Sequence, residues 1–296
     1  MLGWRLFLGP ILIAALIGLF WLDTQRGATA PILALLALGL GFRSTWELVQ
    51  LLRVRFQPQF GLTVGCVLAV IASNWYWLLR PETFAGTADA VARLGPVMLV
   101  VSLAVALLFV NGLWRYEAPG RSLETLGSEL LVLSYVGVFV SLVVQMRWLD
   151  SAKLGYLPLA SLVVATKCGD TAAYFTGRAL GKTKLCPKIS PGKTRAGGVG
   201  ALVGAALGSV AWFHWAGPGL FGVTSGPWYA VAFYGVVLGL VGLVGDLAES
   251  LIKRDVGQKD SAPLLPGFGG LLDLLDSILF TAPVAYLLWL VLPLVG

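Results

Sequence analysis

Hydrophobic residues run along this chain in nine long stretches that shorter polar segments separate. The stretches cover residues 5–22, 31–51, 60–79, 94–114, 127–146, 155–177, 197–216, 228–250 and 271–292. Each is close to the roughly 20 apolar residues that cross a bilayer as a helix. The runs are continuous, whereas the strands of a membrane barrel alternate apolar and polar residues in segments of about ten. The pattern predicts an all-α, polytopic integral membrane protein with about nine transmembrane helices.

Charged residues are scarce along the chain. Of its 296 residues, 57% are hydrophobic and 12% are charged, and the mean hydropathy is +0.84. About a quarter of the residues of a soluble domain are charged. This composition excludes a water-soluble globular protein and leaves little room for a soluble domain beside the helices.

Lysine and arginine residues between the stretches indicate the orientation of the chain. If the N-terminus is cytoplasmic, fifteen of them fall on the cytoplasmic side and five on the other side. Cytoplasmic loops of membrane proteins carry such an excess. We therefore expect a cytoplasmic N-terminus and cytoplasmic positions for both long polar loops. The motif Ala28-Thr29-Ala30 mimics a signal cleavage site, but Pro31 follows it, so we expect an uncleaved first span.

Polar clusters are distributed unevenly along the chain. Residues 1–154 hold few of them, so we predict an N-terminal set of scaffold helices, and residues 155–296 form the predicted catalytic region with cytoplasmic loops. In that region Gly200, Gly204 and Gly208 recur every four residues. Small residues at this spacing let two membrane helices approach closely. They predict helix packing, either within the chain or between subunits.

Cysteine and histidine offer little chemistry. Cys66, Cys168 and Cys186 lie far apart in the sequence, and His214 is the single histidine. No closely spaced cysteine pair indicates a thiolate metal site or a disulfide framework. A lone histidine in an apolar stretch argues against paired histidine ligands or a histidine–carboxylate relay.

The predicted helix 155–177 contains two charged residues near its polar end. Lys167 and Asp170 stand three residues apart. They therefore either form an ion pair within the helix or face a functional cavity. The sequence leaves both interpretations open.

The segment that follows, residues 178–195, carries six lysine or arginine residues. These cations either bind anionic lipid headgroups or contact a phosphate-bearing substrate. The motif Ser-Pro-Gly-Lys-Thr at residues 190–194 favours a phosphate, because hydroxyl groups and an ammonium group lie beside a glycine. Pro187 excludes a Walker A loop, which requires glycine at that position.

A third polar group lies at the end of the stretch 228–250. Asp246, Glu249, Ser250 and Lys253 follow the spacing i, i+3, i+4, i+7, so they share one face of a helix. A solvated polar face is one interpretation. Because Asp246 comes directly after an apolar run, we expect its carboxylate to face a cavity instead.

The fourth polar group precedes the last stretch. Lys259 and Asp260 lead through the motif Pro-Gly-Phe-Gly-Gly at residues 266–270 to Asp273 and Asp276. Glycines before a helix let backbone N–H groups approach an anion. Alternatively, the two carboxylates stabilise the start of their own helix.

Three of these carboxylates, Asp246, Asp273 and Asp276, supply hard oxygen ligands near cationic and glycine-rich segments. Mg²⁺ typically takes one or two carboxylates and completes its coordination with water and substrate phosphates. The combination predicts magnesium and phosphate chemistry.

The motifs resemble those of the phosphatidate cytidylyltransferase (CDP-diacylglycerol synthase) family. The resemblance rests on Ser250, Lys253-Arg254, Lys259-Asp260, Pro266-Gly267, Gly269-Gly270, Asp273 and Asp276, in the order and spacing of the family. Upstream support comes from Gly169-Asp170, Ala173-Tyr174-Phe175, Gly177-Arg178, Gly181-Lys182, Ser190-Pro191 and Lys193-Thr194. The motifs cover roughly residues 165 to 280, whereas the first 160 residues match only as a set of spans.

The resemblance implies an enzyme of phospholipid biosynthesis that transfers CMP from CTP to phosphatidate and releases CDP-diacylglycerol and pyrophosphate. It implies Mg²⁺ as the metal, with a monovalent cation such as K⁺ as an additional candidate. The implied partners are CTP, phosphatidate and the lipid bilayer, and no nucleic acid. We expect the enzyme in the cytoplasmic (inner) membrane with its active site facing the cytoplasm, and a homodimer is an oligomeric state to consider.

The resemblance also implies roles for individual residues. Asp246 and Asp273 would hold the metal, and Asp276, Lys253 and Lys259 would complete the catalytic group, with Asp260 near by. The implied substrate-binding residues are Asp170, Ser190, Lys193, Thr194, Ser250, Arg254, Gly269 and Gly270. Arg195 is a further candidate, because its positive charge lies in the basic segment.

Ala196, Phe268 and Leu274 depart from the family's pattern, which has Glu, His and Arg there. These departures leave two alternatives open. One is a CTP-dependent transferase or kinase that acts on another lipid acceptor. The other is a catalytically degenerate relative that binds lipid.

Overall fold

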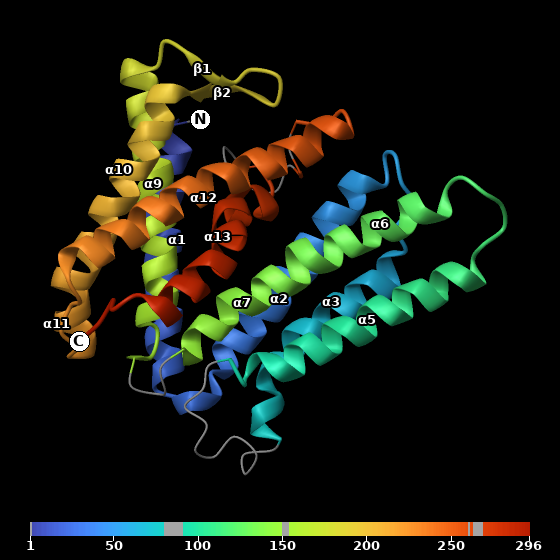
Figure 1. Cartoon of the computed structure of the whole chain (residues 1–296), viewed down its shortest axis with the longest axis horizontal. Coiled ribbons are helices and arrows are strands. Elements are labelled where there is room, and N and C mark those ends of the chain that lie inside the picture. The colour runs from blue at the N-terminus through green and yellow to red at the C-terminus, as the bar shows by residue number, and fades with distance from the viewer. Residues whose placement is uncertain (1, 80–90, 150–153, 260, 263–268) are drawn as a thin grey trace. The chain divides into compact units, whose positions relative to one another are not determined.

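The computed structural model describes residues 2–79, 91–149, 154–259, 261–262 and 269–296, and Figure 1 draws the chain. The regular structure of the described chain is helical apart from two short strands, and the helices agree with the hydrophobic pattern. It forms two compact units: Met1–Gln145 with Val256–Leu274, and Met146–Asp255 with Leu275–Gly296. The predicted division at residue 154 concerns function, and it stays a prediction.

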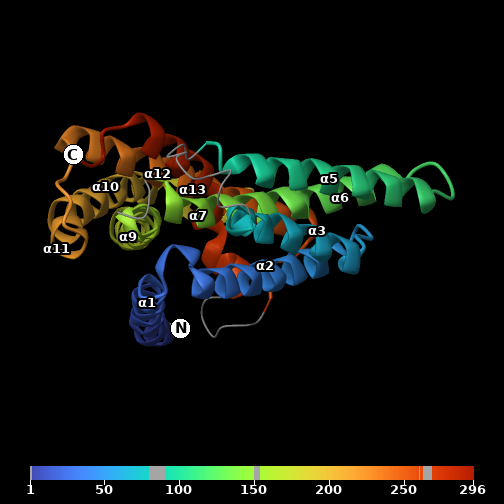
Figure 2. The same cartoon turned by 90° about the horizontal axis from the view of Figure 1, so that it is seen from below.

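The first unit consists of helices that follow one another along the chain. They are α1 (Leu2–Thr24), α2 (Pro31–Leu52), α3 (Phe60–Ala72), α5 (Leu94–Trp114), α6 (Ser122–Val132) and α7 (Phe139–Gln145). Pro31 is the first residue of α2. Proline suits this position, because a backbone N–H there would have no partner within the helix. In both Figure 1 and Figure 2, α5 and α6 lie side by side. Fully buried Leu48, Ile71, Leu108 and Leu133 form part of the core between these helices.

The second unit holds the segment in which most polar motifs fall. Its elements are α9 (Leu157–Leu180), β1 (Lys184–Cys186), β2 (Ser190–Thr194), α10 (Arg195–Ala211), α11 (Gly217–Phe221) and α12 (Trp228–Asp255). The last helix, α13 (Leu271–Val291), starts in the first unit and continues in the second. The two strands form an antiparallel hairpin that pairs Lys184 with Thr194 and Cys186 with Ser190. The basic segment is therefore ordered by strand pairing, which the hydrophobic pattern did not predict.

Glycines allow α10 to lie against α9. A Cβ atom at Gly204 would meet the carbonyl oxygen of Cys168 and the side chain of Ala172, both on α9. Gly200 and Gly208 face the same helix in the same way. The predicted glycine face therefore packs within the chain, and α9 and α10 lie side by side in both views. Because α9 covers this face, the face offers no argument for contact between subunits.

Among the residues that the structure describes, seven helical segments are long and apolar enough to cross a membrane. They are Gly27–Leu52, Phe60–Leu78, Leu94–Trp114, Ser122–Trp148, Arg195–Phe221, Trp228–Asp255 and Leu271–Val291. The predicted stretches 5–22 and 155–177 are also helical, as α1 and α9, although α9 carries the charges of Lys167, Asp170 and Arg178. The all-α membrane class is confirmed, and the number nine and the cytoplasmic N-terminus stay predictions.

Candidate active site

Charged and polar side chains from four elements of the second unit form one group, which we call the polar cluster. Its members are Lys167 and Asp170 on α9, Lys193 on β2, Asp246 on α12, and Asp276 and Ser277 on α13. Four of them, Asp170, Lys193, Asp246 and Asp276, are residues that the sequence predicts for the site. The fold therefore brings together residues from all four polar segments of the sequence.

Lys167 and Asp170 form the ion pair that their spacing allows, with 3.0 Å between Nζ and Oδ2. The pair is not isolated, because Ser277 of α13 lies beside both residues. The Ser277 hydroxyl donates to Asp170 Oδ2 at 2.9 Å, and Lys167 Nζ donates to Ser277 Oγ at 3.2 Å. These contacts connect α9 to α13. The ion pair is thus part of a network between helices as well as an interaction within one helix.

Asp246 forms an ion pair with Lys193 of the hairpin. The distance between Lys193 Nζ and Asp246 Oδ2 is 2.8 Å, and 16% and 42% of the two side chains are exposed. Lys193 Nζ also lies 3.5 Å from the carbonyl oxygen of Leu243, one turn earlier on α12. The hairpin therefore places the Lys193 ammonium group beside the Asp246 carboxylate, which remains partly exposed.

Asp276 is the buried carboxyl group of the polar cluster, with 6% of its surface exposed. The charges of Asp246, Asp170 and Lys167 all act on it. Close packing of α12 on α13 explains the proximity to Asp246, since glycine at 242 and 245 leaves α13 room to approach. The cluster thus holds three carboxyl groups, those of Asp170, Asp246 and Asp276, near the ammonium groups of Lys167 and Lys193.

A second ion pair lies further along α12. Lys253 Nζ is 2.7 Å from Glu249 Oε2, and the two side chains are 12% and 2% exposed. At the end of the helix, Arg254 Nε donates to the carbonyl oxygen of Ile189 in the hairpin at 3.2 Å. Ser250 lies between Glu249 and Lys253 in the sequence, and its side chain is half-buried. The predicted polar face of this helix therefore includes a buried, paired glutamate rather than only solvated groups.

Residues of the hairpin and of the start of α10 have structural contacts. Thr194 is the N-cap of α10, where its Oγ1 accepts the backbone N–H of Gly197 at 3.1 Å. The exposed residue Arg195 donates its backbone N–H to the carbonyl oxygen of Thr183 at 3.0 Å. Ser190 is half-buried at the start of β2. Their predicted contacts with substrate stay predictions.

Asp273 belongs to the first unit and lies in the first turn of α13. Its Oδ2 accepts the backbone N–H of Gly270 at 2.7 Å, and the hydroxyl and backbone N–H of Ser261 at 2.9 and 3.3 Å. An acidic side chain in the first turn that accepts the N–H of the residue before the helix is a capping arrangement. The predicted role of Asp273 as a helix stabiliser is therefore confirmed, and its predicted role as a metal ligand stays a prediction.

The remaining predicted residues of this region divide into two groups. Lys259 is exposed, and Gly269 and Gly270 directly precede α13. Asp260 and Phe268 lie outside the residues that the structure describes.

The sequence analysis missed Glu47. This residue of α2 is fully buried in the first unit and accepts backbone N–H groups from Leu271 and Leu272. The sequence did contain a signal for this residue, which is a carboxylate within the apolar stretch 31–51. An ionisable residue at membrane depth is costly unless it has a partner, so such a position indicates a buried interaction. The sequence could not identify that partner, which is 224 residues away.

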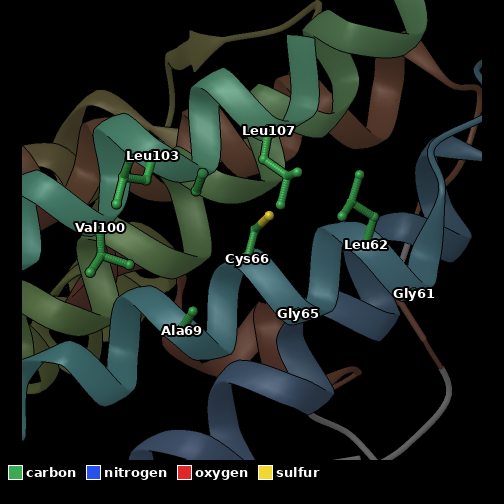
Figure 3. Close-up of a pocket in the computed structure, with 9 residues that line it drawn as sticks. Gly61, Leu62, Gly65, Cys66, Ala69, Val100, Leu103 and Leu107 are labelled. Atoms are coloured by element: carbon green, nitrogen blue, oxygen red, sulfur yellow. The ribbon is translucent and has the colours of Figure 1, made fainter. Parts of the chain in front are cut away.

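Two cavities of the first unit lie apart from these residues. One, of about 300 Å³, is lined by apolar residues of α3 and α5, among them Leu62, Cys66, Leu103 and Leu107 (Figure 3). The other, of about 640 Å³, lies around the connection between α5 and α6 and includes Arg115. Neither is lined by a predicted site residue.

Carboxylate oxygens in the polar cluster are suitable ligands for a hard divalent ion, and the neighbouring ammonium groups suit phosphate. Among the described residues, no group of three or more histidine, cysteine, aspartate or glutamate side chains is arranged to hold a metal ion. An ion at this cluster would therefore take further ligands from water or from a substrate. That arrangement is the usual one for Mg²⁺ with nucleotides.

Comparison with known proteins connects this geometry to a family. A model described as the cytidylyltransferase family matches residues 4–292. The chain is 30% identical over 290 residues to a phosphatidate cytidylyltransferase of Haemophilus influenzae, covering 96% of each chain. It is also 30% identical over 255 residues to the Bacillus subtilis phosphatidate cytidylyltransferase, covering 86% of this chain and 87% of the relative. The match includes every described member of the polar cluster, and the chain belongs to the cytidylyltransferase family.

Proposed function

We propose that this integral membrane protein is a phosphatidate cytidylyltransferase, which transfers CMP from CTP to phosphatidate and yields CDP-diacylglycerol and pyrophosphate. The observation that carries the proposal is the polar cluster, which combines accessible carboxylates and cations within a chain similar over its whole length to enzymes of that name. Such a group suits a substrate that brings phosphates and a metal together.

The proposal includes Mg²⁺. Asp246 is the first candidate ligand, because its carboxylate is 42% exposed and is paired with Lys193 in the polar cluster. Asp170 is 41% exposed and can serve as an additional carboxylate, while the family motif also assigns Asp273 to the metal. When bound, Mg²⁺ would neutralise charge that develops on the phosphates during transfer.

The proposed reaction requires no histidine base. The phosphate group of phosphatidate has a second pKa of about 6, so it is mostly a dianion at neutral pH. One of its oxygens attacks the α-phosphorus of CTP, the new P–O bond forms, and the bond to the β-phosphate breaks with loss of pyrophosphate. The protein's task is to hold two polyanions in line, which cations and hydrogen-bond donors achieve.

Lys193 is the cation that we assign to the phosphates of CTP. Its ammonium group lies 2.8 Å from the Asp246 carboxylate, so a phosphate bound to Lys193 would lie beside the proposed metal ligand. Lys253, Arg254, Lys259 and Arg195 are further candidates for phosphate contacts from the sequence motifs. Lys253 is held by the buried Glu249, which limits its movement.

The proposal also covers location. CTP is dissolved in the cytosol, whereas phosphatidate keeps its acyl chains in the bilayer, so the site has to lie where the two compartments meet. The excess of lysine and arginine in the predicted cytoplasmic segments supports a site at the cytoplasmic face of the inner membrane.

A product assay tests the function. Purified protein in lipid nanodiscs would be given phosphatidate, Mg²⁺ and CTP labelled at the α-phosphate or, separately, at the γ-phosphate. We expect the α-label in an organic-soluble CDP-lipid and the γ-label in pyrophosphate. A γ-label in the lipid would indicate a kinase instead, and the absence of any labelled lipid with phosphatidates of several chain lengths would contradict the proposal.

A further inference from the structure

A buried carboxylate from α2 holds the first turn of α13. Glu47 Oε1 accepts the backbone N–H of Leu271 at 3.1 Å, and Oε2 accepts that of Leu272 at 2.9 Å. The first N–H groups of a helix have no partner within the helix, so a carboxylate there satisfies them and also interacts favourably with the helix dipole. Glu47 is fully buried, and Arg43 Nε donates to its Oε1 at 2.9 Å. Its charge is therefore paired rather than isolated.

The same network includes Asp273. The Ser261 hydroxyl lies 2.9 Å from Asp273 Oδ2 and 3.3 Å from Glu47 Oε2. A hydroxyl group has one hydrogen, so it can donate to only one of these carboxylates at a time. Asp273 and Glu47 therefore share Ser261, and displacement of one carboxylate changes the hydrogen bonding of the other.

The two glycines before α13 allow this arrangement. Gly269 has φ +88°, a conformation that side-chain-bearing residues rarely adopt. A Cβ atom on Gly270 would collide with Ser261 Oγ and Glu47 Oε2. Because neither glycine has a side chain, Glu47 and Asp273 can both approach the first turn of α13.

We propose that Glu47 is a positioning residue for Asp273. Glu47 belongs to α2, which is far from α13 in the sequence, and its hydrogen bonds fix the first turn of α13. That turn determines the direction of the Asp273 carboxylate. The inference rests on the proposed function, in which the family motif assigns Asp273 to the metal. Partners that orient a metal ligand typically contribute about 10–100-fold to metal affinity or activity.

The test is Glu47→Gln in the full-length protein in nanodiscs. An amide keeps the size of the side chain and one acceptor oxygen, but its NH₂ group faces a backbone N–H. We expect Mn²⁺ binding, measured by electron paramagnetic resonance, to weaken by about tenfold or more. We also expect the Mg²⁺ concentration for half-maximal CDP-lipid synthesis to rise by a similar factor, with the KM for CTP at saturating Mg²⁺ close to that of the wild type.

Two further variants change residues that lie next to Glu47 at the first turn of α13. Gly270→Ala adds the Cβ atom that would collide with Glu47, and Ser261→Ala removes the shared hydroxyl while it keeps the backbone contacts of Glu47. We expect both to weaken Mn²⁺ binding in the same direction, Ser261→Ala less than Gly270→Ala. Ser261→Ala is the variant to rely on if Glu47→Gln does not yield folded protein.

Glu129→Gln is the matched control. Glu129 is also a buried glutamate of the first unit, and it accepts the backbone N–H of Gln59, directly before α3, at 2.9 Å. Within the described part of the chain, Glu129 forms no hydrogen bond or ion pair with α13. Its amide variant should therefore lower thermal stability without a change in Mn²⁺ affinity.

The outcomes separate the two proposals. If the wild type synthesises CDP-lipid and the variants at 47, 261 and 270 bind Mn²⁺ as well as the wild type does, Glu47 is structural only and the positioning role is wrong. If Glu129→Gln weakens Mn²⁺ binding as much as Glu47→Gln, the effect is not specific and the inference is equally overturned. If the wild type makes no CDP-lipid, the proposed function itself fails.

Discussion

Asp246 combines an ion pair with an accessible surface. Its partner Lys193 is 2.8 Å away, yet 42% of the Asp246 side chain is exposed. Ion pairs in such a setting contribute about 0–1 kcal/mol to stability. The pair of Lys193 and Asp246 therefore contributes little to folding stability. Substitutions in it should affect activity much more than stability.

The first prediction concerns Asp246. Asp246→Asn removes the negative charge but keeps the size of the side chain, so we expect kcat/KM for CDP-lipid synthesis to fall by about 10²–10³-fold, the usual effect of removing one electrostatic contact at a reacting centre. The thermal midpoint should change little. The control is Asp255→Asn at the exposed end of the same helix, which should retain nearly full activity. Equal activity of the two variants would contradict the assignment.

The second prediction concerns Lys193. Loss of a charge-assisted hydrogen bond costs about 1.5–3 kcal/mol, and each 1.4 kcal/mol is tenfold in affinity. We therefore expect Lys193→Met to raise the KM for CTP by about tenfold or more in steady-state assays. Lys188→Met removes a charge from the exposed turn of the same hairpin and should have a much smaller effect. If both variants behave alike, general attraction by the basic segment explains the result and Lys193 has no specific role.

At the scale of elements, close helix packing positions the polar cluster. Gly204 lets α10 approach α9, which carries Lys167 and Asp170, and glycines of α12 lie against α13. Thr194 links β2 to α10 as the helix cap. The hairpin that carries Lys193 is therefore tied to a tightly packed group of helices, so errors in that packing should reduce stability and activity together.

The third prediction tests this packing. Gly204→Ala places a methyl group against the carbonyl oxygen of Cys168 and the side chain of Ala172. Overpacking of this kind costs about 1–3 kcal/mol, so the thermal midpoint in detergent should fall. Gly65→Ala is the control, because a Cβ atom on this α3 glycine has no neighbour within 4 Å. Since alanine favours a helix over glycine, the control should be neutral or more stable. A drop for Gly65→Ala but not for Gly204→Ala would refute the packing argument.

At the scale of the whole molecule, the membrane is the solvent that determines the fold class. Backbone N–H and C=O groups find no water in the hydrocarbon core, so a spanning chain satisfies them within its own helices. Seven described segments meet the length and composition of such helices. The orientation of the chain depends on loop charges, and it leads to a direct test.

The fourth prediction concerns orientation. Arg195–Phe221 is a candidate span, so the hairpin before it and the loop after it should lie on opposite sides of the membrane. Single cysteines would be introduced as Lys188→Cys and Pro227→Cys, both at exposed positions, in a chain without its natural cysteines. In inner-membrane vesicles of known orientation, we expect an impermeant maleimide to label Lys188→Cys from the cytoplasmic side only and Pro227→Cys from the other side only. The reverse pattern would invert the proposed topology.

The sequence by itself determined the membrane class, the helical stretches and the motif residues, because each of these depends on composition and on residues close together in the chain. It could not predict the hairpin, since basic residues without hydrophobic alternation carry no clear strand signal. It also left the partner of Lys193 undetermined. The tertiary structure alone decided which distant charges meet: Ser277 binds Asp170 across 107 residues, and Glu47 holds Leu272 across 225. Such contacts follow from helix packing in three dimensions, where a buried charge takes whichever partner the fold brings within hydrogen-bonding distance.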